Sequence, residues 1–152
     1  MAEKEIHPLK RKSIKPSSST VRGMLPGPQF RSLDAAMQNL RSAGLRLEWI
    51  WKSKSLGWVC AGMVEQTVLC ELRPTLEPFV GVVVLPKEAC THALASEEIP
   101  DSYKRVLGAP MKETKNEFVY EFVLETTQFR DLLSNFVEAL VPSVEDFLRQ
   151  ES

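Results

Sequence analysis

Apolar and polar positions alternate through the segment from Leu45 to Leu85, and this alternation predicts a β-sheet. In Leu45–Trp51 every second residue is a large apolar one, and charged residues fall between them. Successive side chains of a strand point to opposite faces, so a period of two is typical of a half-buried strand. Phe79–Leu85 is apolar at both parities, which indicates a central strand or one covered on both faces. The segment predicts four consecutive strands, at Leu45–Trp51, Gly57–Met63, Gln66–Leu72 and Phe79–Leu85.

Helical periodicity precedes and follows these strands. Ser32–Ala43 has apolar residues at helical spacing, with Ser32 as the expected N-cap and Gly44 just past its end. The broadest apolar stripe follows Thr126 or Thr127, one of which we expect to cap a C-terminal helix that Pro142 interrupts. Two short helices and a fifth strand are predicted between them, at Lys87–Ala95, Ser102–Gly108 and Glu117–Glu125.

These elements predict one α+β domain over residues 29–152, with an antiparallel sheet of about five strands and helices packed on one face. Strands joined by short links pair antiparallel, and helices grouped around such a sheet cover one of its faces. Arg46, Glu48 and Lys52 are typical of an exposed edge strand, because charges discourage further pairing. We therefore expect the first strand at the edge, and a monomer or weak dimer.

Residues 1–28 are predicted to be a disordered basic tail. The segment holds six Lys and Arg residues against two Glu, a Ser-Ser-Ser-Thr run and four prolines. Such a composition buries too little apolar area to offset the entropy lost on ordering. Two interpretations stay open: a solvated extension, or an arm that binds nucleic acid or an acidic partner.

The overall composition narrows the classes of protein. Apolar residues make up 43% and charged residues 26%, which is ordinary for a globular chain, and the net charge of −1 does not favour a polyanion partner. The three cysteines are not closely spaced, so we expect a reducing cytoplasm rather than a disulfide framework. No run approaches the ~18 apolar residues that span a bilayer, so no membrane association is expected.

Three tryptophans are the most distinctive candidate site. Trp49 and Trp51 share a parity, and Trp58 begins the next strand, so the indoles are expected to adjoin across the hairpin. One interpretation is an aromatic wall for a flat or cationic ligand, with Glu48 or Glu71 as the polar contact. The other is that the indoles are core residues. The first defines the leading hypothesis, a non-enzymatic cytoplasmic module that binds a small molecule or a protein in a cleft between sheet and helix.

Enzymatic chemistry is the alternative hypothesis, through Glu48, Glu71 or His92 in an unrecognised arrangement. Catalysis by Cys60 or Cys70 is disfavoured, because both fall on predicted strands and read as small buried apolar residues. No metal-ligand spacing and no glycine-rich phosphate loop is present, so no cofactor is expected. A further alternative is a nucleic-acid accessory protein that acts through the basic tail.

The order of these elements resembles a family of small bacterial proteins known only as a domain of unknown function. The resemblance extends from Leu33 to Ala139, and it implies the same α+β fold without assigning any functional residue. The tryptophan-rich first strand, the basic tail and the nearly neutral Val64-Glu65-Gln66 hairpin differ from the family pattern. The residues that carry the resemblance are Gly57-Trp58, Leu69, Leu72, Pro74, Phe79 and Leu85.

Overall fold

The computed structural model describes residues 7–17, 20–76, 79–124 and 126–151. Over these residues the elements follow the predicted order, with additions near the N-terminus and before the last strand. They are η1 (Pro8–Lys10), η2 (Val21–Met24), α1 (Gly27–Ser42), β1 (Arg46–Ser53), β2 (Gly57–Val64), β3 (Thr67–Arg73), β4 (Val80–Pro86), α2 (Lys87–Leu94), α3 (Asp101–Leu107), β5 (Lys112–Glu113), β6 (Glu117–Val123) and α4 (Thr127–Glu151).

The strands of the described chain form one antiparallel sheet in the order β1-β2-β3-β4-β6-β5. The predicted α+β class is confirmed, and β1 lies at an edge as expected. The sheet has six strands instead of about five, because Lys112 and Glu113 of β5 pair with Val119 and Phe118 of β6. Both β5 residues are exposed and polar, so no apolar alternation marks this strand in the sequence.

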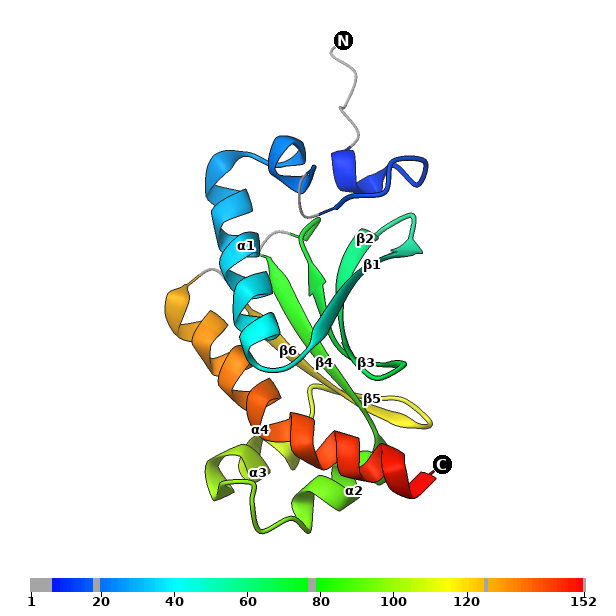
Figure 1. The fold of residues 1–152 in the computed structure, drawn as a ribbon, viewed down its shortest axis with the longest axis vertical. Coiled ribbons are helices and arrows are strands. Elements are labelled where there is room, and N and C mark those ends of the chain that lie inside the picture. Colours follow the sequence, from blue (N-terminus) through cyan, green and yellow to red (C-terminus); the bar gives the residue numbers. More distant parts are fainter. Residues whose placement is uncertain (1–6, 18–19, 77–78, 125, 152) are drawn as a thin grey trace.

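Helices α1 and α4 lie on the same face of the sheet and pack against each other (Figure 1). Phe136 of α4 is almost fully buried. Its ring centroid lies 6.0 Å from that of Tyr103 on α3 and 5.8 Å from those of Tyr120 and Phe122 on β6. Burying a side chain of this size contributes roughly 1.5–3 kcal/mol. This aromatic cluster therefore fixes α4 on both the sheet and α3.

Helix α4 runs from Thr127 to Glu151 and continues through Pro142, where the sequence predicts an interruption. Proline removes one backbone hydrogen bond and bends a helix, but tertiary packing can hold the two sides together. Val141, Ser143 and Val144 are buried beside this proline, and Figure 1 shows α4 bent along its length. The prediction of a break was wrong because it considered the backbone alone.

The N-terminal segment lies against the domain where the structure describes it, although its composition predicts disorder. Leu9 is fully buried, and Val21 and Leu25 belong to the same core. η1 contacts β2 at Gly57, whose φ is +67° and where a Cβ would meet the backbone of Leu9. These apolar anchors are isolated and have no period, so the sequence pattern does not reveal them. Residues 1–6 and 18–19 of the predicted tail lie outside the described residues.

Helix α1 begins at Gly27 rather than at the predicted N-cap Ser32. Pro26 precedes it and Pro28 stands in its first turn. Proline suits this position, because its φ is already helical and its missing N–H would have no partner in the helix. The prolines assigned to the tail therefore start the helix, and the extra turn reaches the connection between β3 and β4.

Candidate functional site

A pocket of about 380 Å³ lies where the start of α1 meets the connection between β3 and β4. Pockets that bind small molecules usually measure about 300–1,000 Å³, so this one has room for a compact ligand. Its walls come from the N-terminal segment, from α1 with the residues before it, from the β3–β4 connection and from the end of β6. The lining residues are His7, Leu25, Pro28, Gln29, Ser32, Leu33, Pro74, Thr75, Leu76, Phe79 and Leu124.

The apolar part of the pocket belongs to the core of the domain. Leu33 and Leu124 are 1% and 0% exposed. The backbone N–H of Leu124 donates to the carbonyl of Phe79 at 2.8 Å, which joins the start of β4 to the end of β6. Thr75 Oγ1 donates to the carbonyl of Leu56 at 2.7 Å and ties the β3–β4 connection to the turn before β2. The site is therefore formed in the folded chain without a ligand.

The polar part of the pocket is neutral apart from one histidine. Gln29 and Ser32 stand one helical turn apart on α1, and Thr75 lies on the β3–β4 connection. His7 Nδ1 accepts the backbone N–H of Leu9 at 3.1 Å, which orients the imidazole beside η1. The described lining contains no Asp, Glu, Lys, Arg or Cys. Such walls suit a mostly apolar molecule with one or two hydrogen-bonding groups.

The predicted indole cluster is assembled but does not line this pocket. Trp51 and Trp58 stand opposite each other in register, with ring centroids 5.7 Å apart at 73°. Trp49 and Trp58 are each 8% exposed, while Trp51 is half-buried. Trp58 Nε1 donates to the carbonyl of Arg11 at 2.9 Å. Trp58 is thus tied to the N-terminal segment, which also carries His7.

The two predicted carboxylates lie on the opposite face of the sheet. Glu48 and Glu71 both pair with Ala61, one from each side. This parity separates them from the indoles, because Trp49 and Trp51 alternate with Glu48 along β1, and Trp58 has the parity opposite to Ala61 on β2. Glu48 is about half exposed and lies 3.5 Å from Arg46. The sheet itself therefore stands between either carboxylate and a ligand held by the indoles.

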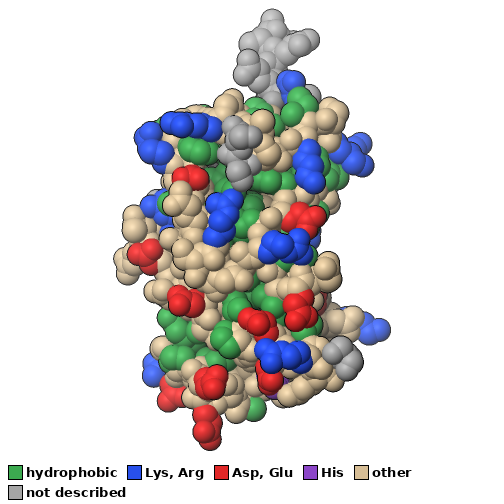
Figure 2. All heavy atoms as spheres, viewed as in Figure 1, with side chains coloured by type: hydrophobic (Ala, Val, Ile, Leu, Met, Phe, Trp, Pro, Cys, Tyr) green, Lys and Arg blue, Asp and Glu red, His purple; other side chains and the backbone are tan. Residues whose placement is uncertain are grey.

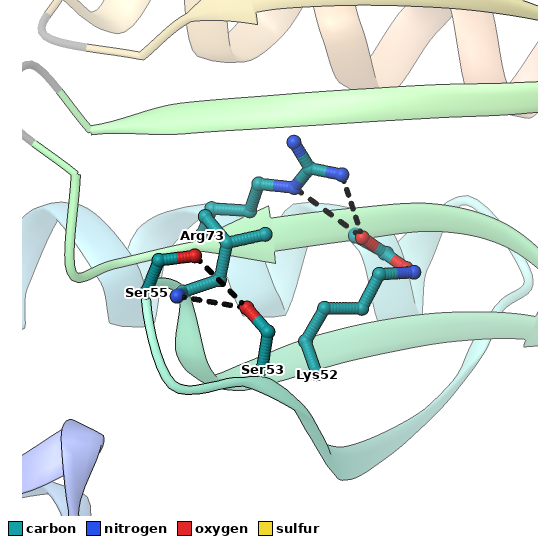
Figure 3. A network of polar contacts seen from close by, with 6 residues as sticks. Lys52, Ser53, Ser55 and Arg73 are labelled. Atoms are coloured by element: carbon teal, nitrogen blue, oxygen red, sulfur yellow. Dashed lines mark hydrogen bonds and ion pairs between the residues drawn. The ribbon is translucent and has the colours of Figure 1, made fainter.

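Glu71 is the buried centre of a polar network with Lys52 and Arg73, which are labelled in Figure 3. Its side chain is 7% exposed. Lys52 Nζ donates to Oε1 at 2.7 Å, and Arg73 Nη2 donates to Oε2 at 3.1 Å. Both carboxylate oxygens are thus neutralised and hydrogen-bonded, which is what a buried charge requires. Because Lys52 lies on β1 and Glu71 and Arg73 lie on β3, the network gives this glutamate a structural role: it links β1 to β3 across β2.

His92, the remaining residue of the predicted enzyme alternative, lies elsewhere. It is on α2, and its Nε2 lies 2.9 Å from Asp146 Oδ2 on α4. Its ring also contacts Phe147. The structure therefore places His92 between two helices and Glu71 on the face of the sheet that α1 and α4 leave open.

The three cysteines are buried and free, as predicted for small apolar residues. Burial raises the pKa of the Cys60 thiol to about 12, and it also raises the pKa of Cys70. Burial, and then the neighbouring Cys90, raise the pKa of Tyr120, whose hydroxyl donates to the carbonyl of Leu107 at 2.7 Å. A neutral thiol is a poor nucleophile. These groups therefore serve packing at neutral pH.

The comparisons with known proteins add no assignment: no family model, curated protein or solved structure matches the chain. Within the described ranges, no set of three or more His, Cys, Asp or Glu residues is placed to hold a metal ion. The same ranges contain no helix with the length and hydropathy needed to cross a membrane. The pocket is therefore interpreted from its own geometry.

Proposed function

We propose that this protein is a binding module that holds a small, mostly apolar molecule in the pocket between α1 and the β3–β4 connection. The supporting observation is the convergence of four separate segments on a volume of about 380 Å³. Leu33 and Leu124 supply buried apolar surface, and Gln29, Ser32 and Thr75 supply neutral hydrogen-bonding groups. A ligand that filled this space would gain roughly 25 cal/mol for each Å² of apolar surface removed from water.

In this proposal the indoles support the site instead of forming its wall. Trp58 binds the carbonyl of Arg11, and Arg11 follows η1, which in turn follows His7. A ligand that contacts His7 therefore acts on the same short segment that accepts the hydrogen bond of Trp58. The fluorescence of Trp58 becomes a reporter of binding, even though the ligand does not touch its ring.

The proposal also keeps the expected cytoplasmic, non-enzymatic role. Three buried free thiols are compatible with a reducing compartment. The lining offers surfaces for shape and hydrogen bonding, whereas His92 and Glu71 belong to contacts outside it. The pocket therefore supports recognition of a ligand better than it supports a reaction.

A fragment screen monitored by amide NMR tests the proposal. Neutral fragments of roughly ten to fifteen heavy atoms match a pocket of this size. Binding should shift the amides of Gln29, Ser32 and Thr75 and leave those of β5 unchanged. Hits that mainly shift the amides of Trp49 and Trp51 would instead place the binding site at the indoles. A library with no hit at all would contradict the proposal.

A further inference from the structure

The basic residues of the N-terminal third are concentrated in one uninterrupted stretch. From His7 to Leu33 the chain carries six Lys and Arg residues and no Asp or Glu. Five of the six, all except Lys10, are exposed in the structure. None of the six forms an ion pair within the described part of the chain. They are Lys10, Arg11, Lys12, Lys15, Arg22 and Arg31.

The fold adds a cation from the sheet to this stretch. Lys54 lies in the turn between β1 and β2 and is exposed. That turn ends at Gly57, which contacts the backbone of Leu9 and Lys10. We call the six residues together with Lys54 the basic end. Their charges come from three separate parts of the chain, and the docking of η1 on β2 brings two of these parts side by side.

Acidic residues gather at the opposite end of the molecule. Figure 2 shows Lys and Arg side chains around the end that carries the N-terminal segment, and Asp and Glu mostly toward the other end, where further Lys and Arg side chains lie among them. Glu97 and Glu98 lie there between α2 and α3, Asp101 begins α3, and all three are exposed. The net charge of −1 therefore coexists with a stretch of the N-terminal third that carries only positive charges, and a polyanion approaching the basic end meets little repulsion.

We infer that the basic end binds nucleic acid through the phosphate backbone. The cations are dispersed over short segments, which suits a regular line of phosphates better than one pocketed anion. Ile14 is the sole large apolar residue exposed in the described part of this stretch, so little apolar surface is available to enter a lipid bilayer. No exposed aromatic side chain is present there to stack on bases, so binding is independent of sequence. The inference does not depend on a ligand in the pocket.

The test measures binding of a labelled duplex DNA of mixed sequence by fluorescence anisotropy, over a series of salt concentrations. The variant Arg11→Gln, Lys12→Gln, Lys15→Gln removes three exposed cations whose side chains make no ion pair in the described chain. The salt slope should fall by about 0.9 for each cation that contacts phosphate. Affinity near 50 mM salt should fall by roughly tenfold or more. Unchanged thermal unfolding would show that the variant keeps its fold.

A matched variant controls for net charge. Lys104→Gln, Arg105→Gln, Lys115→Gln also removes three positive charges, but from α3 and the segment before β6. It should bind DNA within about twofold of the unmodified protein, since only charges near the bound phosphates release counterions. Equal weakening by both variants, or binding insensitive to salt, would overturn the inference. So would absence of DNA binding, including the case in which vesicles of anionic phospholipid bind instead.

Discussion

Replacement of Leu9 by alanine should destabilise the domain, although the sequence places this residue in a disordered tail. Leu9 is 0% exposed and packs in the main core. A buried Leu→Ala change costs about 2–5 kcal/mol when the surroundings cannot relax. Here the residues around η1 can partly detach, so the cost should lie near the low end of this range, close to the roughly 1.5–3 kcal/mol that the burial of one leucine contributes. We expect a loss of about 2 kcal/mol.

Urea unfolding followed by far-UV circular dichroism measures this loss. For a chain of this size the expected shift in melting temperature is about 4–8 °C. Trp58 emission should also move to longer wavelength in the native variant, because its hydrogen bond to Arg11 depends on the docked segment. Ile14→Ala is the matched control: Ile14 is 46% exposed, so the change should stay within about 0.5 kcal/mol. Equal effects of both substitutions would refute the docked arrangement.

Three further substitutions or treatments follow from the same structure. Glu71→Gln should lower the free energy of unfolding in urea by about 1–2 kcal/mol, because its buried charge-assisted hydrogen bonds are lost. The exposed control Glu48→Gln should lower it by less than about 0.5 kcal/mol. Equal losses would contradict the assignment of Glu71 as the buried centre of the network. Gly81→Ala should destabilise the fold by about 1–3 kcal/mol, because the added methyl group would lie 2.7 Å from Leu133 and 2.9 Å from Leu124. The control Gly23→Ala would meet nothing within 4 Å and should not change the stability. An unchanged stability of Gly81→Ala would disprove this packing. The Cys60 thiol should resist a disulfide reagent near pH 8 in the native protein and react on unfolding. Its pKa is about 12 when folded and 9.0 otherwise, so stability should also fall as pH rises through this interval, and rapid native modification would contradict its burial.

The sequence predicts the sheet well because the buried positions of its strands are apolar and form a recognisable pattern. Val82 and Val83 of β4 are both fully buried, which agrees with an apolar run at both parities. The pairing of Trp51 with Trp58 follows from parity and a short link. The sequence does not predict β5, because its two residues are exposed and show no apolar pattern; only their pairing with β6 makes them a strand. Periodicity thus predicts the elements that bury a face and misses those that pairing alone defines.

The pocket could not be predicted in the same way. Its lining combines His7, the first turns of α1, the β3–β4 connection and Leu124, which are far apart in the chain. Pro26 and Pro28 are typical helix breakers, although here they start α1 and so place Gln29 in the helix turn that lines the pocket. A proline pair followed by helical periodicity was the available signal. Glu48 and Trp49 are adjacent on a predicted strand, so the sequence also predicts that their side chains point to opposite faces of the sheet.

The most direct test of the binding site titrates one fragment hit into two tryptophan variants of α1. Ser32 lines the pocket, whereas Ser42 is exposed at the end of the same helix. An indole at position 32 would fill much of a volume of about 380 Å³. Ser32→Trp should weaken binding by roughly tenfold or more, the loss of about 1.4 kcal/mol, while Ser42→Trp should bind like the unmodified protein. Equal affinity of both variants would place the ligand outside the pocket and contradict the proposed function.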